Sequence, residues 1–152
     1  MVNTRDQDLA LSVRRGRIVC DSTDCTGCTA CEAVCSLFHE GVVSPGLSRI
    51  QIATWEYEGW RSEIYVCEQC QGAECLAACQ WGAMYIDERT GARVIDEKKC
   101  NGCKECMEAC PCTPSRIRYN EEKIVCVKCD LCGGEPQCVK YCQEGALNFD
   151  GG

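Results

Sequence analysis

Cysteines at regular spacing carry the clearest chemical signal in this sequence of 152 residues. Sixteen of the nineteen cysteines fall into four groups of four, which begin at positions 25, 67, 100 and 129. The first and third groups follow the pattern C-x2-C-x2-C-x3-C, and Pro111 follows the third group. This is the spacing with which thiolates bind [4Fe–4S] clusters in bacterial proteins. With four thiolates for each cluster, the sequence predicts four [4Fe–4S] clusters.

In such a group, three cysteines lie on one tight loop and the fourth follows on a short helix. In two-cluster proteins the fourth cysteine binds the neighbouring cluster, so that two groups form one interlocked unit. Gly27 and Gly102 lie inside the first and third loops. Glycine permits a positive φ there and lets backbone N–H groups approach the sulfurs. We therefore expect two interlocked units with two clusters each.

Disulfides and zinc are the alternative uses of so many cysteines. Disulfides are typical of secreted proteins, but no apolar signal segment follows the polar residues 1–8. Arg14-Arg15 resembles a twin-arginine signal only faintly, because no apolar segment follows it either. Zinc sites pair two C-x2-C units, often with histidine, and His39 is the only histidine of this chain. A zinc-stabilised interaction module is therefore the remote alternative.

The composition indicates a core built by clusters rather than by side chains. Leu, Ile, Val and Phe together make up less than a fifth of the chain, and the net charge is −7. Such a composition is typical of disordered chains, so we expect the chain without clusters to be largely unfolded. The acidic balance argues against nucleic acid as a partner. No run approaches the roughly 18 apolar residues of a membrane span, and we expect a cytoplasmic protein.

Short helices and strands between the groups must position the ligands. The recurring groups predict a repeat of ligand loop, short helix and strand. We expect helices at 30–36, 74–79, 104–110 and 137–142. We expect strands at 17–20, 49–54, 64–66, 84–87, 93–96, 117–120, 123–127 and 147–149, with hairpin turns at 87–91 and 120–122. The predicted fold is α+β, with a tail over 1–16 and a four-cluster domain over 17–150.

The longest connection between groups contains Trp55, Tyr57 and Trp60 within residues 41–60. This segment is either a plain connector or, because aromatic residues are enriched in interfaces, a docking surface. Charge also differs between groups: Asp21, Asp24 and Glu32 lie near the first group, and lysines flank the third. We therefore expect the cluster of the first group to have a lower potential than that of the third.

From about Arg17 to Phe149, the groups and their order resemble the four-cluster iron–sulfur subunits of molybdenum and tungsten oxidoreductases. The resemblance implies an α+β fold of two bacterial dicluster ferredoxin-like units and a non-catalytic subunit that transfers electrons. It also implies that the first group pairs with the fourth and the second with the third. The implied ligand sets are Cys25, Cys28, Cys31 and Cys142; Cys129, Cys132, Cys138 and Cys35; Cys67, Cys70, Cys75 and Cys110; and Cys100, Cys103, Cys106 and Cys79.

Two stretches narrow the resemblance. Residues 35–41 (CSLFHEG) and 128–140 (KCDLCGGEPQCVK) look like the small electron-transfer subunits of tungsten enzymes of the aldehyde oxidoreductase type. The implied partners are a tungsten or molybdenum catalytic subunit and a flavin subunit that exchanges electrons with a nicotinamide. A row of clusters would also allow self-association into an extended electron wire. The alternatives are an iron–sulfur subunit of a formate, hydrogenase or sulfoxide-type complex, and a free polyferredoxin.

Cys20, Cys112 and Cys126 are left over. Each is either a small buried thiol or a further ligand or redox thiol, and an alternative fourth group would use Cys126 together with Cys129. A proline often follows the last cysteine of such a group, but here those positions hold Ser36, Gln80 and Gln143. This difference leaves the reduction potentials of the clusters undetermined and does not affect which cysteines bind them. No phosphate loop and no catalytic triad is present, and a single histidine is more often structural than catalytic.

Overall fold

Short elements and long loops make up the computed structural model, which describes residues 15–57 and 59–152. The helices are α2 (Ala30–Glu40), α3 (Glu74–Ala78), α4 (Glu105–Glu108) and α5 (Gln137–Lys140), with 3-10 turns at Pro45–Leu47 and Leu131–Gly134. The strands are β1 (Arg17–Cys20), β2 (Gln51–Trp55), β3 (Arg61–Tyr65), β4 (Met84–Ile86), β5 (Arg93–Ile95), β6 (Arg118–Asn120), β7 (Val125–Val127) and β8 (Leu147–Asp150). The α+β prediction is confirmed.

The strands pair into four two-stranded antiparallel sheets within the described residues. β2–β3, β4–β5 and β6–β7 are local hairpins, and the last two turn where the sequence predicted turns. The β1–β8 sheet is different, because it places Ile18 opposite Phe149 and so joins segments from opposite ends of the described chain. β1 precedes the first cysteine group and β8 follows the fourth, so this sheet brings those two groups together.

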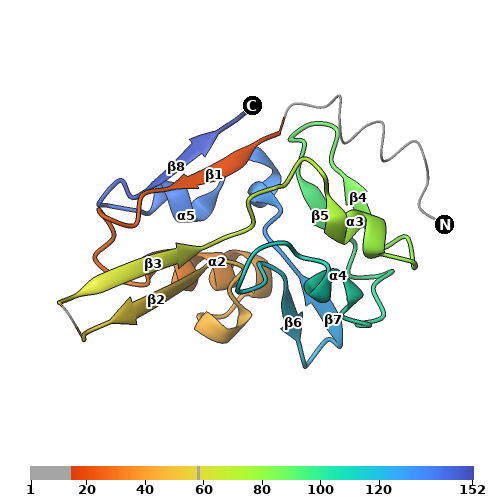
Figure 1. Ribbon diagram of the computed structural model, residues 1–152, viewed down its shortest axis with the longest axis horizontal. Helices are drawn as coiled ribbons and strands as arrows, with labels where there is room; N and C mark the ends of the chain where they lie inside the picture. The colour runs from red at the N-terminus through yellow and green to blue at the C-terminus, as the bar shows by residue number, and fades with distance from the viewer. Residues whose placement is uncertain (1–14, 58) are drawn as a thin grey trace.

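Two units lie side by side in Figure 1. The first unit contains β1, α2, β2, β3, α5 and β8, and the second contains α3, β4, β5, α4, β6 and β7. There are two buried clusters of side chains. One surrounds Ile50 and Leu131 and extends into the second unit through Cys67 and Ala92, and the other surrounds Leu76 and Met84 in the second unit. Both clusters include several cysteines, so sulfur atoms form a large part of each core.

Four charged side chains join the two units. Arg49 of the first unit is buried and contacts Glu40 at 3.3 Å and Glu97 of the second unit at 2.9 Å. Lys123, in the β6–β7 hairpin, contacts the same two carboxylates at 2.6 and 3.0 Å. Because Arg49 and Glu40 are largely shielded from water, salt screens this network less than it screens surface pairs. The network therefore helps to fix the units against each other.

Several predicted boundaries were wrong. Helix α2 continues to Glu40 instead of ending at residue 36, and Gly41 ends it with φ +74° and an N–H donated to the Leu37 carbonyl. The predicted strand 123–127 begins only at Val125, because Ile124 has φ +56° and cannot join an extended strand. The predicted strands 49–54 and 64–66 are shifted to β2 and β3, which form one longer hairpin.

The proposed tail over 1–16 lies mostly outside the described residues. Within the described part, Arg15 donates to the Gln69 carbonyl at 3.1 Å and the Gly16 N–H donates to the Thr90 carbonyl at 2.9 Å. These two residues therefore belong to the folded domain. Among the described residues, no helix is long and apolar enough to cross a membrane.

Candidate iron–sulfur centres

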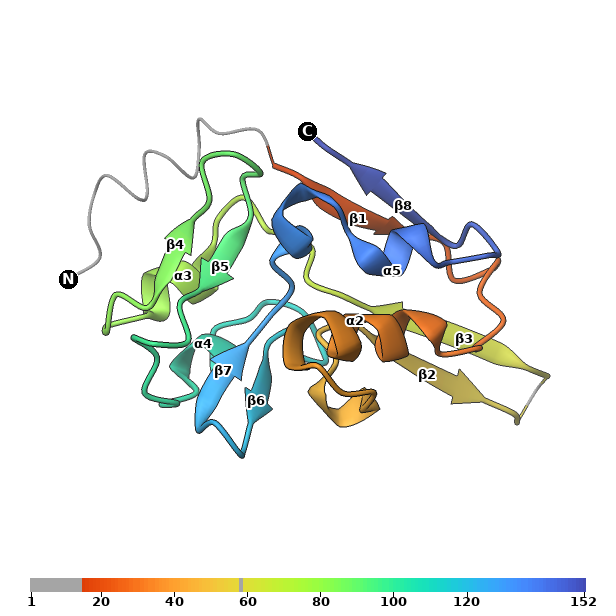
Figure 2. The same ribbon diagram turned by 180° about the vertical axis from the view of Figure 1, so that it is seen from behind.

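Thiol groups line two cavities of the first unit. Cavity A is lined by Cys25, Cys28, Cys31 and Cys142, and cavity B by Cys35, Cys129, Cys132 and Cys138. Helix α2 contributes Cys31 to cavity A and, one turn later, Cys35 to cavity B. Helix α5 contributes Cys138 to cavity B, and Cys142 follows its end into cavity A. The two helices pack side by side (Figure 2). Each helix, together with the residues at its end, therefore contributes one thiol to cavity A and one to cavity B.

The second unit has the same arrangement, in which each helix contributes cysteines to two cavities. Cavity C is lined by Cys67, Cys70, Cys75 and Cys110, and cavity D by Cys79, Cys100, Cys103 and Cys106. Helix α3 and its end carry Cys75 and Cys79 to different cavities, and α4 and the residues after it do the same with Cys106 and Cys110. The structure thus brings together the four sets that the resemblance implied. The ligand assignment itself stays a prediction.

Left-handed backbone positions shape the ligand loops. Thr29, Ala73 and Lys104 stand directly before α2, α3 and α4, and each has a positive φ between 48° and 66°. Gly27 and Gly102 both have φ +73° inside the first and third loops. A residue in this conformation turns the chain sharply. The turn directs the cysteines of the loop toward the cavity. Because non-glycine residues adopt this conformation at a cost, each loop stores some strain.

The number and kind of the lining side chains fit an iron–sulfur cluster, and burial affects their thiol groups. Burial raises the pKa of Cys31 to about 12 and that of Cys132 to about 11. Thiols with such pKa values stay protonated at neutral pH, unless a bound metal cation displaces the proton. Four cysteines that line one cavity supply the four thiolates that a [4Fe–4S] cluster needs.

Backbone N–H groups point at several of these sulfurs. Donors within 3.3 to 3.4 Å of a sulfur are the N–H groups of Arg49 on Cys35, Gln69 on Cys67, Arg116 on Cys110 and Cys126 on Cys100. Hydrogen bonds to a ligand sulfur stabilise its thiolate form and raise the potential of the cluster that it holds. In cavities B, C and D, such hydrogen bonds would therefore raise the reduction potential of a bound cluster.

The four cavities follow one another in the order A, B, C, D. Cavities A and B share α2 and α5, and cavities C and D share α3 and α4. Cavities B and C meet across the unit boundary, where burial and then the nearby Cys67 raise the pKa of Cys129 well above its usual value. All nineteen cysteines lie in the described part of the chain, and only Cys28 of cavity A and Cys103 of cavity D are exposed. The exposed ligands thus lie at the two ends of the row, and Cys67 and Cys129 at the junction of cavities B and C are buried.

Gln69 occupies the junction between cavities B and C. Its side chain is fully buried and donates from Nε2 to the Cys129 carbonyl at 2.9 Å. Its Oε1 accepts the Arg93 N–H at 2.8 Å, and its own N–H donates to Cys67 Sγ. One side chain therefore connects the cysteine segments of both units. Gln69 was not predicted from the sequence, where only its place between Cys67 and Cys70 could have pointed to it.

Two buried cations line cavity C, and neither was predicted from the sequence. Lys128 and Arg93 are almost fully buried, and Lys128 Nζ donates to the Arg93 carbonyl at 2.6 Å. Burial lowers the pKa of Arg93 from its usual value, but a guanidinium stays charged at neutral pH. A cluster with four thiolates has a net charge of about −2. The two cations therefore offset negative charge that would otherwise be costly to bury.

His39 places a positive charge beside cavity B. Its Nδ1 lies 3.0 Å from the Cys35 carbonyl and its Nε2 lies 2.9 Å from Asp130 Oδ1. Both partners are acceptors, so both ring nitrogens must carry hydrogen. Burial would lower the pKa of His39, but the hydrogen bonds to Asp130 and Cys35 outweigh it and raise that pKa to about 9. His39, Asp130 and Cys132 also lie close enough to hold a metal ion, but Cys132 already belongs to cavity B.

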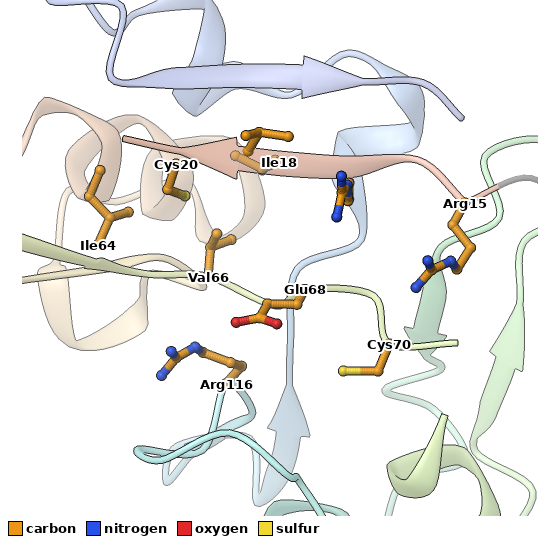
Figure 3. A pocket seen from close by; sticks show the side chains of 10 residues that line it. Arg15, Ile18, Cys20, Ile64, Val66, Glu68, Cys70 and Arg116 are labelled. Atoms are coloured by element: carbon orange, nitrogen blue, oxygen red, sulfur yellow. The ribbon is translucent and has the colours of Figure 1, made fainter. Parts of the chain in front are cut away.

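A cleft of about 480 Å³ lies beside cavities A, B and C and shares lining residues with each of them (Figure 3). It lies between β1, the segment after β3 and the loop before β6. Its lining includes Arg15, Arg17, Arg116, Glu68, Cys20 and Cys70. In Figure 3 the charged ends of Glu68 and Arg116 face each other across the cleft, and Cys70 borders it. Arg116 lines both this cleft and cavity C, so it brings positive charge to a cavity whose cluster would add negative charge.

The three spare cysteines have different surroundings. Cys20 lines the cleft, Cys112 lines cavity C as a fifth thiol, and Cys126 lines cavity D as a fifth thiol. Cys126 therefore lies away from cavity B, where Cys129 and Cys132 are found. This placement does not fit the alternative fourth group that would have used Cys126 with Cys129.

Exposed aromatic side chains extend from cavity A along the β2–β3 hairpin. Tyr57 is 92% exposed, Trp60 is 59% exposed and Trp55 is 39% exposed. Trp60 packs against the ligand loop, because a Cβ on Gly27 would lie 3.0 Å from its ring. The segment is thus a hairpin that leads to the cavity A loop, rather than a plain connector. Cavity D has Trp81, 60% exposed, in its wall.

Comparison with known proteins agrees with this geometry. Residues 59–151 match the sequence family described as 4Fe-4S dicluster domain. The chain is 42% identical over 120 residues to the aliphatic sulfonate oxidoreductase, polyferredoxin-like subunit, of Pyrococcus furiosus, which covers 79% of this chain and 67% of the relative. It is 33% identical over 144 residues to the thiosulfate reductase electron transfer subunit PhsB of Salmonella typhi, with 85% and 72% covered.

A solved structure shares the fold. The active site complex BamBC of benzoyl coenzyme A reductase, in complex with 1,5-dienoyl-CoA, matches with a TM-score of 0.50 and 25% sequence identity. The match covers 89% of this chain and 75% of that chain. The chain therefore has an α+β dicluster ferredoxin fold, and its nineteen cysteines are consistent with four clusters.

Proposed function

The chain belongs to the 4Fe-4S dicluster domain family, and from this premise we propose that its four cavities each hold one [4Fe–4S] cluster. It is an electron-transfer iron–sulfur subunit of an oxidoreductase complex and not the catalytic subunit. Its sixteen proposed ligands are the cysteines of cavities A to D as given above. Its proposed partner is a molybdenum- or tungsten-containing catalytic subunit.

The row of cavities is the observation that carries this proposal. Cys28 and Cys103 expose the outermost cavities to solvent, while the ligands at the junction of cavities B and C are buried. A carrier that only stores electrons would need one exposed centre. A row with two exposed ends instead suits transfer between two partners, one at cavity A and one at cavity D.

Each bound cluster would accept and release one electron. The protein contributes burial, hydrogen bonds and charge. Apolar side chains such as Ile50 and Leu131 exclude water from cavity B. Gln69 holds the ligand segments of cavities B and C at a fixed separation, and Lys128 offsets the charge of cavity C. These contacts keep the ligands in place when the charge of a cluster changes.

For the catalytic partner we propose an oxidoreductase that acts on a small sulfur compound. The relatives that support this are subunits of a sulfonate oxidoreductase and a thiosulfate reductase. They favour the alternative kept open by the sequence, a subunit of the sulfoxide-type class, over the aldehyde oxidoreductase type. A tungsten partner is the second candidate, supported by the sequence resemblance of residues 35–41 and 128–140 to subunits of tungsten enzymes.

Anaerobic purification of the tagged chain from its source, followed by metal analysis, tests the proposal. We expect about sixteen irons per chain, together with a large subunit that contains molybdenum or tungsten. Turnover of the purified complex with sulfonate, thiosulfate or an aldehyde then distinguishes the partner classes. Iron without a second subunit would indicate a free carrier, and zinc without iron would overturn the assignment.

Two further expectations can be tested on the same material. Fractionation of the cells tests the expected cytoplasmic location. Mass photometry tests self-association into a longer wire, in which an exposed end at Cys28 or Cys103 would meet an exposed end of another copy. A single copy of this chain in every complex would contradict that association.

A further inference from the structure

Cavity D contains a fifth thiol that four-ligand binding does not use. Cys126 lines this cavity together with Cys79, Cys100, Cys103 and Cys106. It lies in the middle of β7 opposite Tyr119 of β6 and is 1% exposed. Cavities A and B are each lined by four cysteines. A cysteine with only a packing role would not need to face a metal-binding cavity.

Cys126 is in contact with one proposed ligand and packs in the same core as another. Its backbone N–H donates to Cys100 Sγ at 3.3 Å. Its side chain lies in the same buried cluster as Cys106, and both residues line cavity D. Cys126 therefore offers a thiol on the wall of the cavity that Cys106 also lines.

The residues around Cys126 restrict its backbone. Lys104 Nζ lies 3.9 Å from the centre of the Tyr119 ring, which is paired with Cys126 across the sheet. The loop of the third group is pressed against the start of β7, since a Cβ on Gly102 would lie 2.5 Å from the Ile124 carbonyl oxygen. The ligand loop is thus packed against the backbone two residues before Cys126.

From these contacts we infer that Cys126 is a reserve ligand of cavity D, which binds iron when Cys106 is lost. In the exchange, the iron–sulfur bond to Cys106 breaks and one to Cys126 forms. The Cys126 thiol releases its proton to water and the departing Cys106 thiolate takes one up, so no electron is gained or lost. The inference rests on the proposed function, because it requires a cluster in cavity D.

Alanine variants with a matched control test this inference. Cys106 and Cys138 are both the third cysteine of their group, both buried and both on a four-residue helix, but cavity B has no fifth cysteine. After anaerobic purification we expect Cys106→Ala to keep about sixteen irons per chain. We expect Cys106→Ala/Cys126→Ala and Cys138→Ala each to lose up to four irons, and Cys126→Ala alone to lose none.

Three results would overturn the reserve role. Cys106→Ala could lose as much iron as Cys138→Ala, it could match the double variant, or Cys126→Ala alone could lose a cluster because Cys126 is a permanent ligand. Iron in the wild-type chain is measured first, so that failure of the proposed function is recognised separately: a wild-type chain without iron refutes the function itself.

A second measurement avoids variants that fail to fold. The wild-type chain and Cys126→Ala both retain all four proposed ligands, and both are exposed to air and an iron chelator. We expect Cys126→Ala to lose its first four irons severalfold faster, while the other twelve leave at unchanged rates. Equal rates for the two proteins would contradict a reserve ligand. Electron paramagnetic resonance of the reduced samples identifies which cluster is lost.

Discussion

Gly102 is expected to be the least replaceable glycine of the ligand loops. Its φ is +73°, and a Cβ there would lie 2.5 Å from the Ile124 carbonyl oxygen. The left-handed conformation alone costs an alanine about 1–2 kcal/mol. Forcing a methyl group against a backbone oxygen adds about 1–3 kcal/mol, as overpacking does elsewhere. Gly145 provides the control, because its φ is +68° and a Cβ there meets nothing within 4 Å.

The difference between the two substitutions isolates the clash. Gly145→Ala bears only the conformational cost. Gly102→Ala should lower the free energy of opening the loop of cavity D by about 1–3 kcal/mol more, which makes the open loop roughly 5- to 150-fold more populated. Unfolding of a metal protein is not two-state, so the assay is the rate of iron loss to a chelator under anaerobic conditions. Gly27→Ala should be intermediate, because its nearest contacts, at 2.9 to 3.0 Å, are side chains that can move.

One clear result would refute this role of Gly102. If Gly102→Ala loses iron no faster than Gly145→Ala, the backbone contact with Ile124 does not hold the loop of the third group. A uniform loss from all four cavities would also contradict it, because the clash concerns cavity D alone. Iron content measured before the chelator is added separates failed assembly from faster release.

Other substitutions test the remaining contacts. Gln69→Leu leaves the Cys129 carbonyl and the Arg93 N–H without their buried partner, which should cost about 1–3 kcal/mol each and slow electron transfer between the units, as seen in stopped-flow traces. His39→Gln removes a charge 3.9 Å from Cys35 Sγ, so potentiometry should show the potential of cavity B lowered by at most roughly 170 mV. Removal of iron should abolish most of the circular dichroism of the folded chain. Potentiometry should also give cavity A a lower potential than cavity D, and the reverse order would refute the charge argument.

The local parts of this site were predictable because they are encoded over a few residues. Cysteine spacing determines which thiols share a loop, and the helix that follows must carry the last thiol one turn further on. Together with the known arrangement of two-cluster proteins, this spacing predicts that Cys31 and Cys35 bind different clusters. The pairing of the first group with the fourth came only from the family resemblance, because contacts over more than 100 residues leave no local pattern.

The parts that the sequence did not predict depend on burial. Gln69, Lys128 and Arg93 are polar residues of kinds that are usually exposed. Their burial makes sense only at a unit boundary beside negatively charged centres, and neither the boundary nor the centres can be located from spacing. The extension of α2 to Glu40 was missed for a different reason. Its end depends on Gly41, whose left-handed conformation stops the helix, and that signal was present in the sequence.

Each short helix contributes cysteines to two neighbouring cavities, and this arrangement explains how a chain so poor in large apolar residues can fold. Every α-helix in the described part of the chain is short, and three of the four have only four or five residues, too few to be stable alone. Each nevertheless stands at the wall of two cavities, so a cluster bound in one cavity would fix a helix that also serves the next. Metal binding therefore supplies folding free energy that is shared within a unit. Gln69 and the ion pairs of Arg49 then connect the two units, so that the order in one unit stabilises the other. The same contacts that hold the fold together thus hold the row of centres in line.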